Sequence, residues 1–202
     1  MTDNLLFKDL VEEIEDFVGL LAGTEQAFGP STAVFRHGKP FKPSLDRSPW
    51  LKHGKPRECF NNATAFAAVR DDVFYAEGYA VGPELVMPVH HAWLVNLNGR
   101  VIDPTWIDIG DHAYFGIAFD RSFIVKQLAV NGGQAGILVN LHLIRRSLRD
   151  RGAIERVILS GSAALQVLSC DSTGLAKVGH VDRRHGLAER IQEARAKETQ
   201  AY

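Results

Sequence analysis

Two short apolar runs joined by Asn98-Gly99 constrain the fold of this chain more than any other feature of its sequence. An Asn-Gly pair between two such runs is a strong signal for a β-hairpin, here over residues 89–106. His91 stands near the start of the first run, and Asp103 stands near the end of the second. The hairpin would therefore present an imidazole and a carboxylate on adjacent strands.

The turn of this hairpin decides which histidine faces Asp103. A two-residue turn would place Asp103 on the same face as His90 and separate it from His91. A three-residue loop with Gly99 in the left-handed conformation would pair Trp93 with Asp103, so that His91 and Asp103 lie diagonally on one face. We predict the three-residue loop with Gly99 in a bulge.

A cysteine stands upstream of this hairpin, at the start of an Ala-rich stretch with helical periodicity. Thiol-dependent acyl transfer needs a nucleophile, a proton shuttle and a group that orients the shuttle. Cys59, His91 and Asp103 can supply these three roles in chain order. The start of a helix would favour the Cys59 thiolate, because unpaired N–H groups and the positive end of the helix dipole lie there.

The rest of the chain predicts a single α+β domain over residues 1–202, with added N- and C-terminal helices. We expect a catalytic core at about 45–130, an N-terminal helix at about 4–22 and a C-terminal helical region at about 134–202. The further expectations are an irregular segment at 28–56 without a helix, a strand at 73–81 and a bulge or close backbone approach at Gly78. We also expect a Gly-rich loop at 110–136 with one short strand or helix near 119–128, an amphipathic helix at 136–150, an apolar piece from beyond Gly152 to about Cys170 and a polar helical tail from Leu187.

Charge and cysteine usage point to a cytoplasmic protein with reduced thiols. The formal net charge is -1, so nothing in the charge balance favours nucleic acid or a membrane surface as a partner. No apolar run approaches the ~20 residues of a membrane span. Two cysteines do not suggest a disulfide framework, and we expect Cys170 to be inert packing. Oligomeric state is left open, and no cofactor is expected.

Four motifs together resemble the transglutaminase-like branch of the papain-like cysteine hydrolase superfamily, over residues 57 to about 120. They are Glu-Cys-Phe-x-Asn-Ala from Glu58, Glu-Gly-Tyr-Ala from Glu77, His-Ala-Trp from His91 and Asp-Pro-Thr-Trp from Asp103. The resemblance implies a papain-like core, in which a helix bearing the cysteine packs on an antiparallel sheet. It also implies Cys59 as nucleophile, His91 as base, Asp103 as orienting group, and a peptide or protein amide as substrate.

The family pattern further implies a second oxyanion donor, usually a side chain upstream of the cysteine. His53, Trp50 and Gln26 are candidates for that donor. Trp93 is a further candidate for the oxyanion site or the cleft, although a core position suits it better. We expect hydrolysis of the acyl-enzyme rather than transfer to an amine, because hydrolysis needs no second recognition site.

Three other hypotheses compete with the hypothesis of a thiol-dependent enzyme. Cysteine, histidine and aspartate are also zinc ligands, and His53, His90 or His112 could complete a tetrahedral site, but no close ligand pair supports zinc. An arylamine N-acetyltransferase uses the same residue order, although this chain is short for that family. A non-catalytic peptide-binding module with the same fold is the third alternative.

Overall fold

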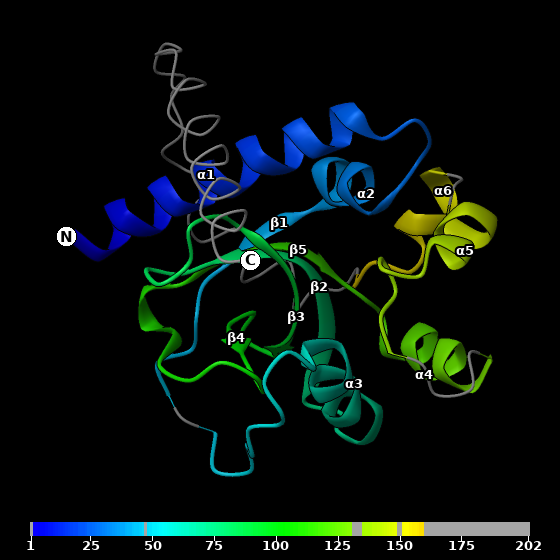
Figure 1. Cartoon of the computed structure of the whole chain (residues 1–202). Coiled ribbons are helices and arrows are strands. Elements are labelled where there is room, and N and C mark those ends of the chain that lie inside the picture. Colours follow the sequence, from blue (N-terminus) through cyan, green and yellow to red (C-terminus); the bar gives the residue numbers. More distant parts are fainter. Residues whose placement is uncertain (1, 47, 131–134, 149–150, 160–202) are drawn as a thin grey trace, which may run out of the picture.

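The computed structural model describes residues 2–46, 48–130, 135–148 and 151–159, which form an α+β fold (Figure 1). Helices and strands alternate irregularly along the chain, so the sheet is built from hairpins and longer returns. The helices are α1 (Thr2–Thr24), α2 (Pro30–His37), α3 (Cys59–Val69), α4 (Arg121–Val130), α5 (Leu141–Leu143) and α6 (Arg151–Glu155), with a 3₁₀ turn at Ile109–Asp111 and a π turn at Ile144–Leu148. The strands are β1 (Lys39–Phe41), β2 (Val73–Val81), β3 (Val89–Asn96), β4 (Val101–Ile102) and β5 (Ala113–Ala118).

The five strands form one curled antiparallel sheet in the order β1-β5-β2-β3-β4. The chain that follows β1 returns to the opposite edge, where Pro43 bridges Val101. The Ser44 N–H donates to the Val101 carbonyl at 2.8 Å, and the Val101 N–H donates to the Lys42 carbonyl at 2.9 Å. This contact covers the short edge strand β4, whose backbone groups would otherwise be open to pairing with another chain.

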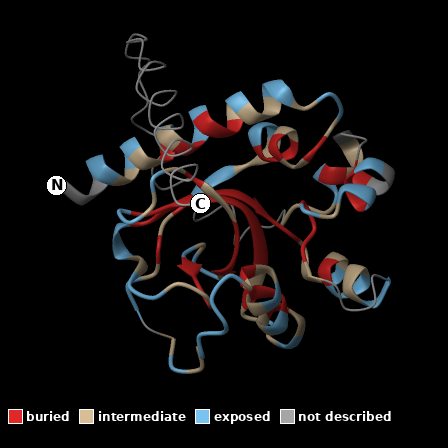
Figure 2. Cartoon of the chain, viewed as in Figure 1, coloured by how far each residue is buried: buried red, intermediate tan, exposed pale blue. Residues whose placement is uncertain are grey.

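Each face of the sheet has its own hydrophobic core, because side chains alternate along every strand (Figure 2). The core on one face includes residues of α1, α2 and α3 as well as odd-numbered residues of β2, and we call it the helix-facing core. The core on the other face is smaller and we call it the opposite core. It contains Phe41, Ala76, Ala80, Trp93, Val95, Val101, Tyr114 and Ala118.

The hairpin has the predicted three-residue loop. Leu94 pairs with Ile102, and the Asn96 N–H donates to the Arg100 carbonyl at 3.0 Å. The Gly99 N–H donates to the Asn96 carbonyl at 2.8 Å, and Gly99 has a φ of 69°. Glycine accepts this left-handed conformation without the steric cost of a side chain. The register prediction is confirmed.

The predicted lack of a helix in residues 28–56 is wrong, because this segment contains α2 and β1. Gly29 and Pro30 mark the start of α2 and do not break it, since proline is well suited to the first turn of a helix. The Glu25 carboxylate accepts hydrogen bonds from the N–H groups of Ser31 and Thr32, both at 2.9 Å. This cap from outside the helix replaces the missing cap at Gly29.

The region 110–136 also differs from the prediction. It contains β5, which is not predicted and lies inside the sheet between β1 and β2. The short element predicted near 119–128 is present as the helix α4. Gly116 of β5 pairs with Gly78 of β2, and a side chain on Gly78 would collide with the Phe115 carbonyl. The expected close backbone approach at Gly78 is therefore confirmed, and its partner is a strand that the glycine-rich sequence conceals.

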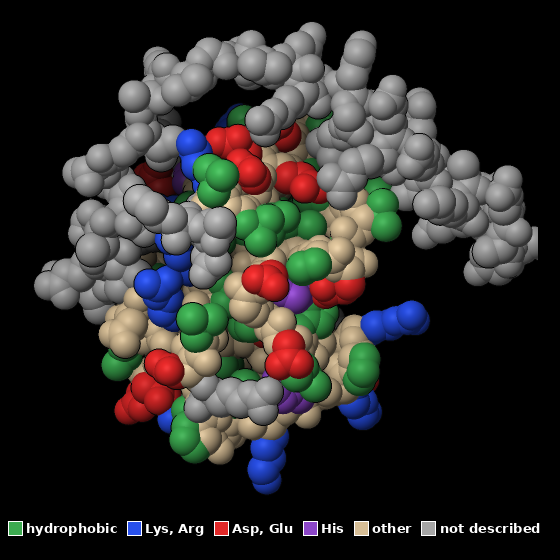
Figure 3. All heavy atoms as spheres, turned by 90° about the vertical axis from the view of Figure 1, so that its left-hand side faces the viewer, with side chains coloured by type: hydrophobic (Ala, Val, Ile, Leu, Met, Phe, Trp, Pro, Cys, Tyr) green, Lys and Arg blue, Asp and Glu red, His purple; other side chains and the backbone are tan. Residues whose placement is uncertain are grey.

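The C-terminal part of the described chain is less helical than expected. Residues 136–140 precede a short helical turn, and the predicted helix at 136–150 is reduced to α5 and the π turn. The apolar piece is described only as far as residue 159, where it includes most of α6 with the buried Ile154. The rest of it and the tail from Leu187 lie outside the described residues. Among the helices that are described, none is long and apolar enough to cross a membrane. On the face shown in Figure 3, acidic, basic and hydrophobic side chains are mixed, in keeping with the near-neutral net charge.

Candidate active site

Cys59 is the first residue of α3 and is 7% exposed. The chain reaches it through a turn in which Arg57 has a φ of 65°, a conformation that non-glycine residues seldom adopt. The N–H groups of the first helical turn have no partner within the helix, so they point past Cys59 toward the space before the helix. The sulfur therefore lies at the electropositive end of α3.

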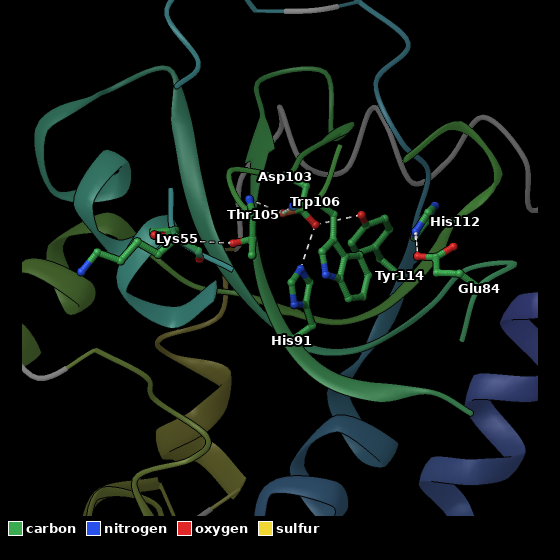
Figure 4. Close-up of polar contacts among 9 residues, drawn as sticks. Lys55, Glu84, His91, Asp103, Thr105, Trp106, His112 and Tyr114 are labelled. Atoms are coloured by element: carbon green, nitrogen blue, oxygen red, sulfur yellow. Dashed lines mark hydrogen bonds and ion pairs between the residues drawn. The ribbon is translucent and has the colours of Figure 1, made fainter. Parts of the chain in front are cut away.

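His91 and Asp103 meet on one face of the hairpin, as the register predicts (Figure 4). The His91 Nε2 atom lies 2.8 Å from Asp103 Oδ2, and both residues are 2% exposed. An ionised carboxylate only accepts hydrogen bonds, so Nε2 carries a proton and donates it to Asp103. Because Nε2 faces Asp103, Nδ1 is the ring nitrogen that remains for a second partner, and Cys59 is among the groups that raise the pKa of His91.

Asp103 accepts four hydrogen bonds, two at each carboxylate oxygen. The backbone N–H groups of Thr105 and Trp106 donate to Oδ1 at 2.7 Å and 3.0 Å. The Tyr114 hydroxyl donates to Oδ2 at 2.9 Å, beside His91 (Figure 4). The carboxylate is therefore fixed in orientation by its own turn and by β5, and its position fixes the ring of His91 in turn.

The charged forms of His91 and Asp103 stabilise each other. Burial alone would lower the pKa of His91, but hydrogen bonds and charge interactions with Asp103 and Cys59 raise it to about 9. Burial alone would raise the pKa of Asp103, but the contact with His91 and the N–H groups of Trp106 and Thr105 hold it below its ordinary value. At neutral pH the buried pair is therefore an imidazolium and a carboxylate.

The pH dependence of folding should report this pair. A raised pKa means that His91 stabilises the fold fully below its unfolded value of about 6.5, and that this contribution is lost as pH rises through about 9. We expect the free energy of unfolding in urea to fall by up to about 3 kcal/mol between pH 6 and pH 9.5. His91→Gln should flatten this slope, whereas an equal slope in the variant would contradict the assignment.

Trp106 covers the histidine. Its ring stacks on the ring of His91 with centroids 3.9 Å apart and planes 9° apart (Figure 4). The opposite core continues behind the pair through Tyr114 and Trp93. A cation over the face of an indole is stabilised electrostatically, and the indole also excludes water from the ion pair.

His90 faces the other way, into the helix-facing core. Its ring stacks on Tyr79 with centroids 5.1 Å apart, and its Nε2 atom lies 3.4 Å from the buried carboxylate of Glu77. Burial lowers the pKa of His90. His90 is thus separated from Asp103 by the alternation of the strand, and the alternative shuttle is not supported.

The structure separates the four candidates for the oxyanion site or cleft. Trp50 packs on Phe66, and the Arg70 guanidinium lies 4.1 Å from the centre of its ring, so it belongs to the end of α3 remote from Cys59. Gln26 is exposed in the turn between α1 and α2. Trp93 is fully buried in the opposite core. These placements do not fit an oxyanion role, because a donor must reach the substrate carbonyl.

His53 is the one of these candidates that lies beside the hairpin. It is exposed, and the N–H of the next residue, Gly54, donates to the Pro104 carbonyl at 2.8 Å. Asn62 of α3 strengthens this junction, because its amide donates to the Lys55 carbonyl at 2.9 Å and to the Thr105 hydroxyl at 3.0 Å. The loop before α3 is thereby tied to the chain that follows Asp103.

Within the described residues, no group of three or more His, Cys, Asp or Glu side chains could hold a metal ion. The histidines considered as zinc ligands lie apart: His112 pairs with Glu84 at 2.9 Å, and His90 lies beside Glu77. No protein-family model, curated protein or solved structure matches this chain. The chemistry of the site therefore rests on its own geometry.

Sequence reasoning missed two contributors to the site. The hydrogen bond from the Tyr114 hydroxyl to Asp103 is not predicted, because the sequence around β5 predicts a loop and gives no strand register. The hydrogen bonds from the N–H groups of Thr105 and Trp106 to the Asp103 side chain could have been predicted, since an aspartate before a proline favours such a turn. Together these residues complete a buried site that can hold a thiol against a charged, oriented imidazole.

Proposed function

We propose that this protein is a thiol-dependent acyl hydrolase or acyltransferase that acts on an amide or isopeptide bond through Cys59, His91 and Asp103. The observation that carries the proposal is the buried 2.8 Å hydrogen bond between His91 and Asp103, on a histidine whose pKa is also raised by Cys59. The position of Cys59 at the start of α3 adds to it, because a helix N-terminus favours a thiolate.

In the proposed reaction each of the three groups has its own step. The Cys59 thiolate attacks the carbonyl carbon of the substrate, and the N–H of Cys59 stabilises the resulting oxyanion. The protonated His91 then donates its Nδ1 proton to the departing amine, and the C–N bond breaks to leave an acyl-enzyme. Water or a second amine attacks the thioester, with His91 as base, and the Cys59 thiolate is released.

The arrangement of elements fits a papain-like core of transglutaminase type. A helix that begins with the cysteine packs against the strand that carries the histidine, and the carboxylate follows the next strand. The substrate would be a peptide or protein amide, and a cytoplasmic location would keep the thiol reduced. A cleft that binds such a peptide without turnover is the competing proposal.

The proposal is tested by trapping the acyl-enzyme. We expect p-nitrophenyl acetate to acetylate Cys59, with an adduct that is seen by intact-protein mass spectrometry and removed by hydroxylamine. Turnover in the wild type should exceed that of Cys59→Ala by at least about a hundredfold, because the thiol is the nucleophile. Equal rates for the two proteins, with no adduct on Cys59, would favour the non-catalytic module.

A further inference from the structure

Glu77 is a fully buried carboxylate to which the proposed reaction gives no part. Its Oε2 atom accepts hydrogen bonds from the Tyr75 hydroxyl at 2.8 Å and from the Ile137 N–H at 2.7 Å. Its Oε1 atom accepts a hydrogen bond from the Val139 N–H at 2.9 Å. Burial of an unpaired carboxylate is costly, so these donors are what keep it in the core. Two of the three belong to the main chain of one segment, residues 136–139, which we call the strap.

The strap lies beside the residue that follows Cys59. A Cβ atom built on Gly136 would lie 3.6 Å from the Cδ1 atom of Phe60, and it would collide with the side chain of Val139. Gly136 has a φ of 94°, so the chain bends here in a conformation that glycine accepts readily. Glu77 therefore holds the strap to β2 at the point where it passes Phe60.

The strap and Phe60 form an apolar surface. Ile137 and Leu138 are buried in the helix-facing core, whereas Val139 is 41% exposed and Phe60 is half-buried. His90 closes the group from β3, since its ring meets Phe60 edge-on with centroids 5.5 Å apart. Phe60 follows Cys59 at the start of α3, so a reagent that approaches Cys59 from the side of Phe60 and the strap meets apolar atoms, which favour an apolar group on that reagent.

We propose that Glu77 is a positioning residue that holds the strap against Phe60 as an apolar wall beside Cys59, and that this wall selects substrates with an apolar group next to the reacting carbonyl. The selection of substrates rests on the function proposed above for Cys59. The presence of the wall does not rest on that function. The rate at which thiol reagents of different bulk react with Cys59 can detect the wall whether or not the protein turns over an acyl substrate.

The test compares two reagents with the same chemistry and different bulk. Methyl and benzyl methanethiosulfonate both form a mixed disulfide with Cys59 and release methanesulfinate, and mass spectrometry of the Cys59 peptide separates this reaction from that of Cys170. In Glu77→Gln the amide NH₂ must face at least one of the donors that the carboxylate accepted, so the strap loosens. We expect the benzyl-to-methyl rate ratio to fall by at least about fivefold, with the methyl rate within about threefold of wild type.

Two further variants keep the test decisive. Val139→Asp changes an exposed side chain of the wall and keeps the backbone N–H that donates to Glu77. It should lower the benzyl-to-methyl rate ratio by at least about fivefold even if Glu77→Gln does not fold. Tyr75→Phe removes the third donor to Glu77 and keeps both strap bonds, so its ratio should stay within about twofold of wild type. Amide hydrogen exchange at Ile137 and Val139 should quicken by about tenfold or more in Glu77→Gln alone.

The possible results distinguish the proposed wall from the proposed acyl-transfer function. An unchanged ratio in Val139→Asp overturns the wall, and an unchanged ratio in a folded Glu77→Gln overturns the role of Glu77. Equal slowing of both reagents in either variant also overturns the proposal, because it indicates general damage. A fall in the ratio without any acyl-enzyme on Cys59 would leave the wall in place and remove the proposed function.

Discussion

Replacing Asp103 with asparagine should lower the rate of Cys59-dependent acyl transfer by about a thousandfold or more. The Oδ1 position accepts two backbone N–H groups, so the amide oxygen of the variant must occupy it. The NH₂ group then takes the Oδ2 position and donates to His91 Nε2, which now has to accept. The ring proton moves to Nδ1, and His91 can no longer take a proton from the thiol.

Tyr114→Phe is the matched control for this variant. It removes a donor to the same carboxylate oxygen but leaves the bond between His91 and Asp103 in place. We expect a loss of less than about tenfold in kcat/KM, measured with p-nitrophenyl acetate, because the histidine keeps its tautomer. If Asp103→Asn also stays within about tenfold of wild type, Asp103 does not orient the shuttle.

Trp93→Ala should lower the free energy of unfolding by about 3–5 kcal/mol, the largest stability effect that we expect. The side chain is fully buried in the opposite core, with ring centroids 5.1 Å from Tyr114 and 6.0 Å from Phe41. Gly116 lies directly over the indole, where a methyl group would already be crowded. Removal of the indole leaves a cavity that the surrounding strands cannot close.

Urea unfolding of Trp93→Ala and Trp50→Ala side by side provides the comparison. Trp50 is only partly buried and packs on Phe66 and Arg70, so its loss should cost about 1–2 kcal/mol. The opposite order of stabilities would show that the opposite core is not closely packed around Trp93.

The contact between His91 and Asp103 could be predicted from the sequence because it depends on one local turn. Asn98-Gly99 limits the hairpin to two registers, and each register assigns a different histidine to Asp103. The observed loop, with Gly99 at a φ of 69°, is the one that brings His91 to Asp103. One local turn therefore predicted a contact between residues twelve positions apart.

The parts that sequence reasoning missed depend on contacts between distant segments. β5 contains a glycine and two alanines among its six residues and has no clear polar-apolar alternation, because it is buried on both faces of the sheet. The cap of α2 comes from Glu25, outside the helix, so the breakers around Gly29 masked it. The contact of Glu77 with the strap could not be predicted from the sequence, since these two of its three donors are backbone groups some sixty residues away.

The rate of Cys59 alkylation by iodoacetamide as a function of pH tests the central claim most directly. The claim is that a buried, protonated His91 stabilises the Cys59 thiolate. Between pH 6 and pH 8 the wild type should react at least about tenfold faster than His91→Ala, because the protonated imidazole stabilises the thiolate. Cys59→Ala corrects for reaction at Cys170. Equal rates in the wild type and His91→Ala across this pH range would contradict the stabilisation of the Cys59 thiolate by His91.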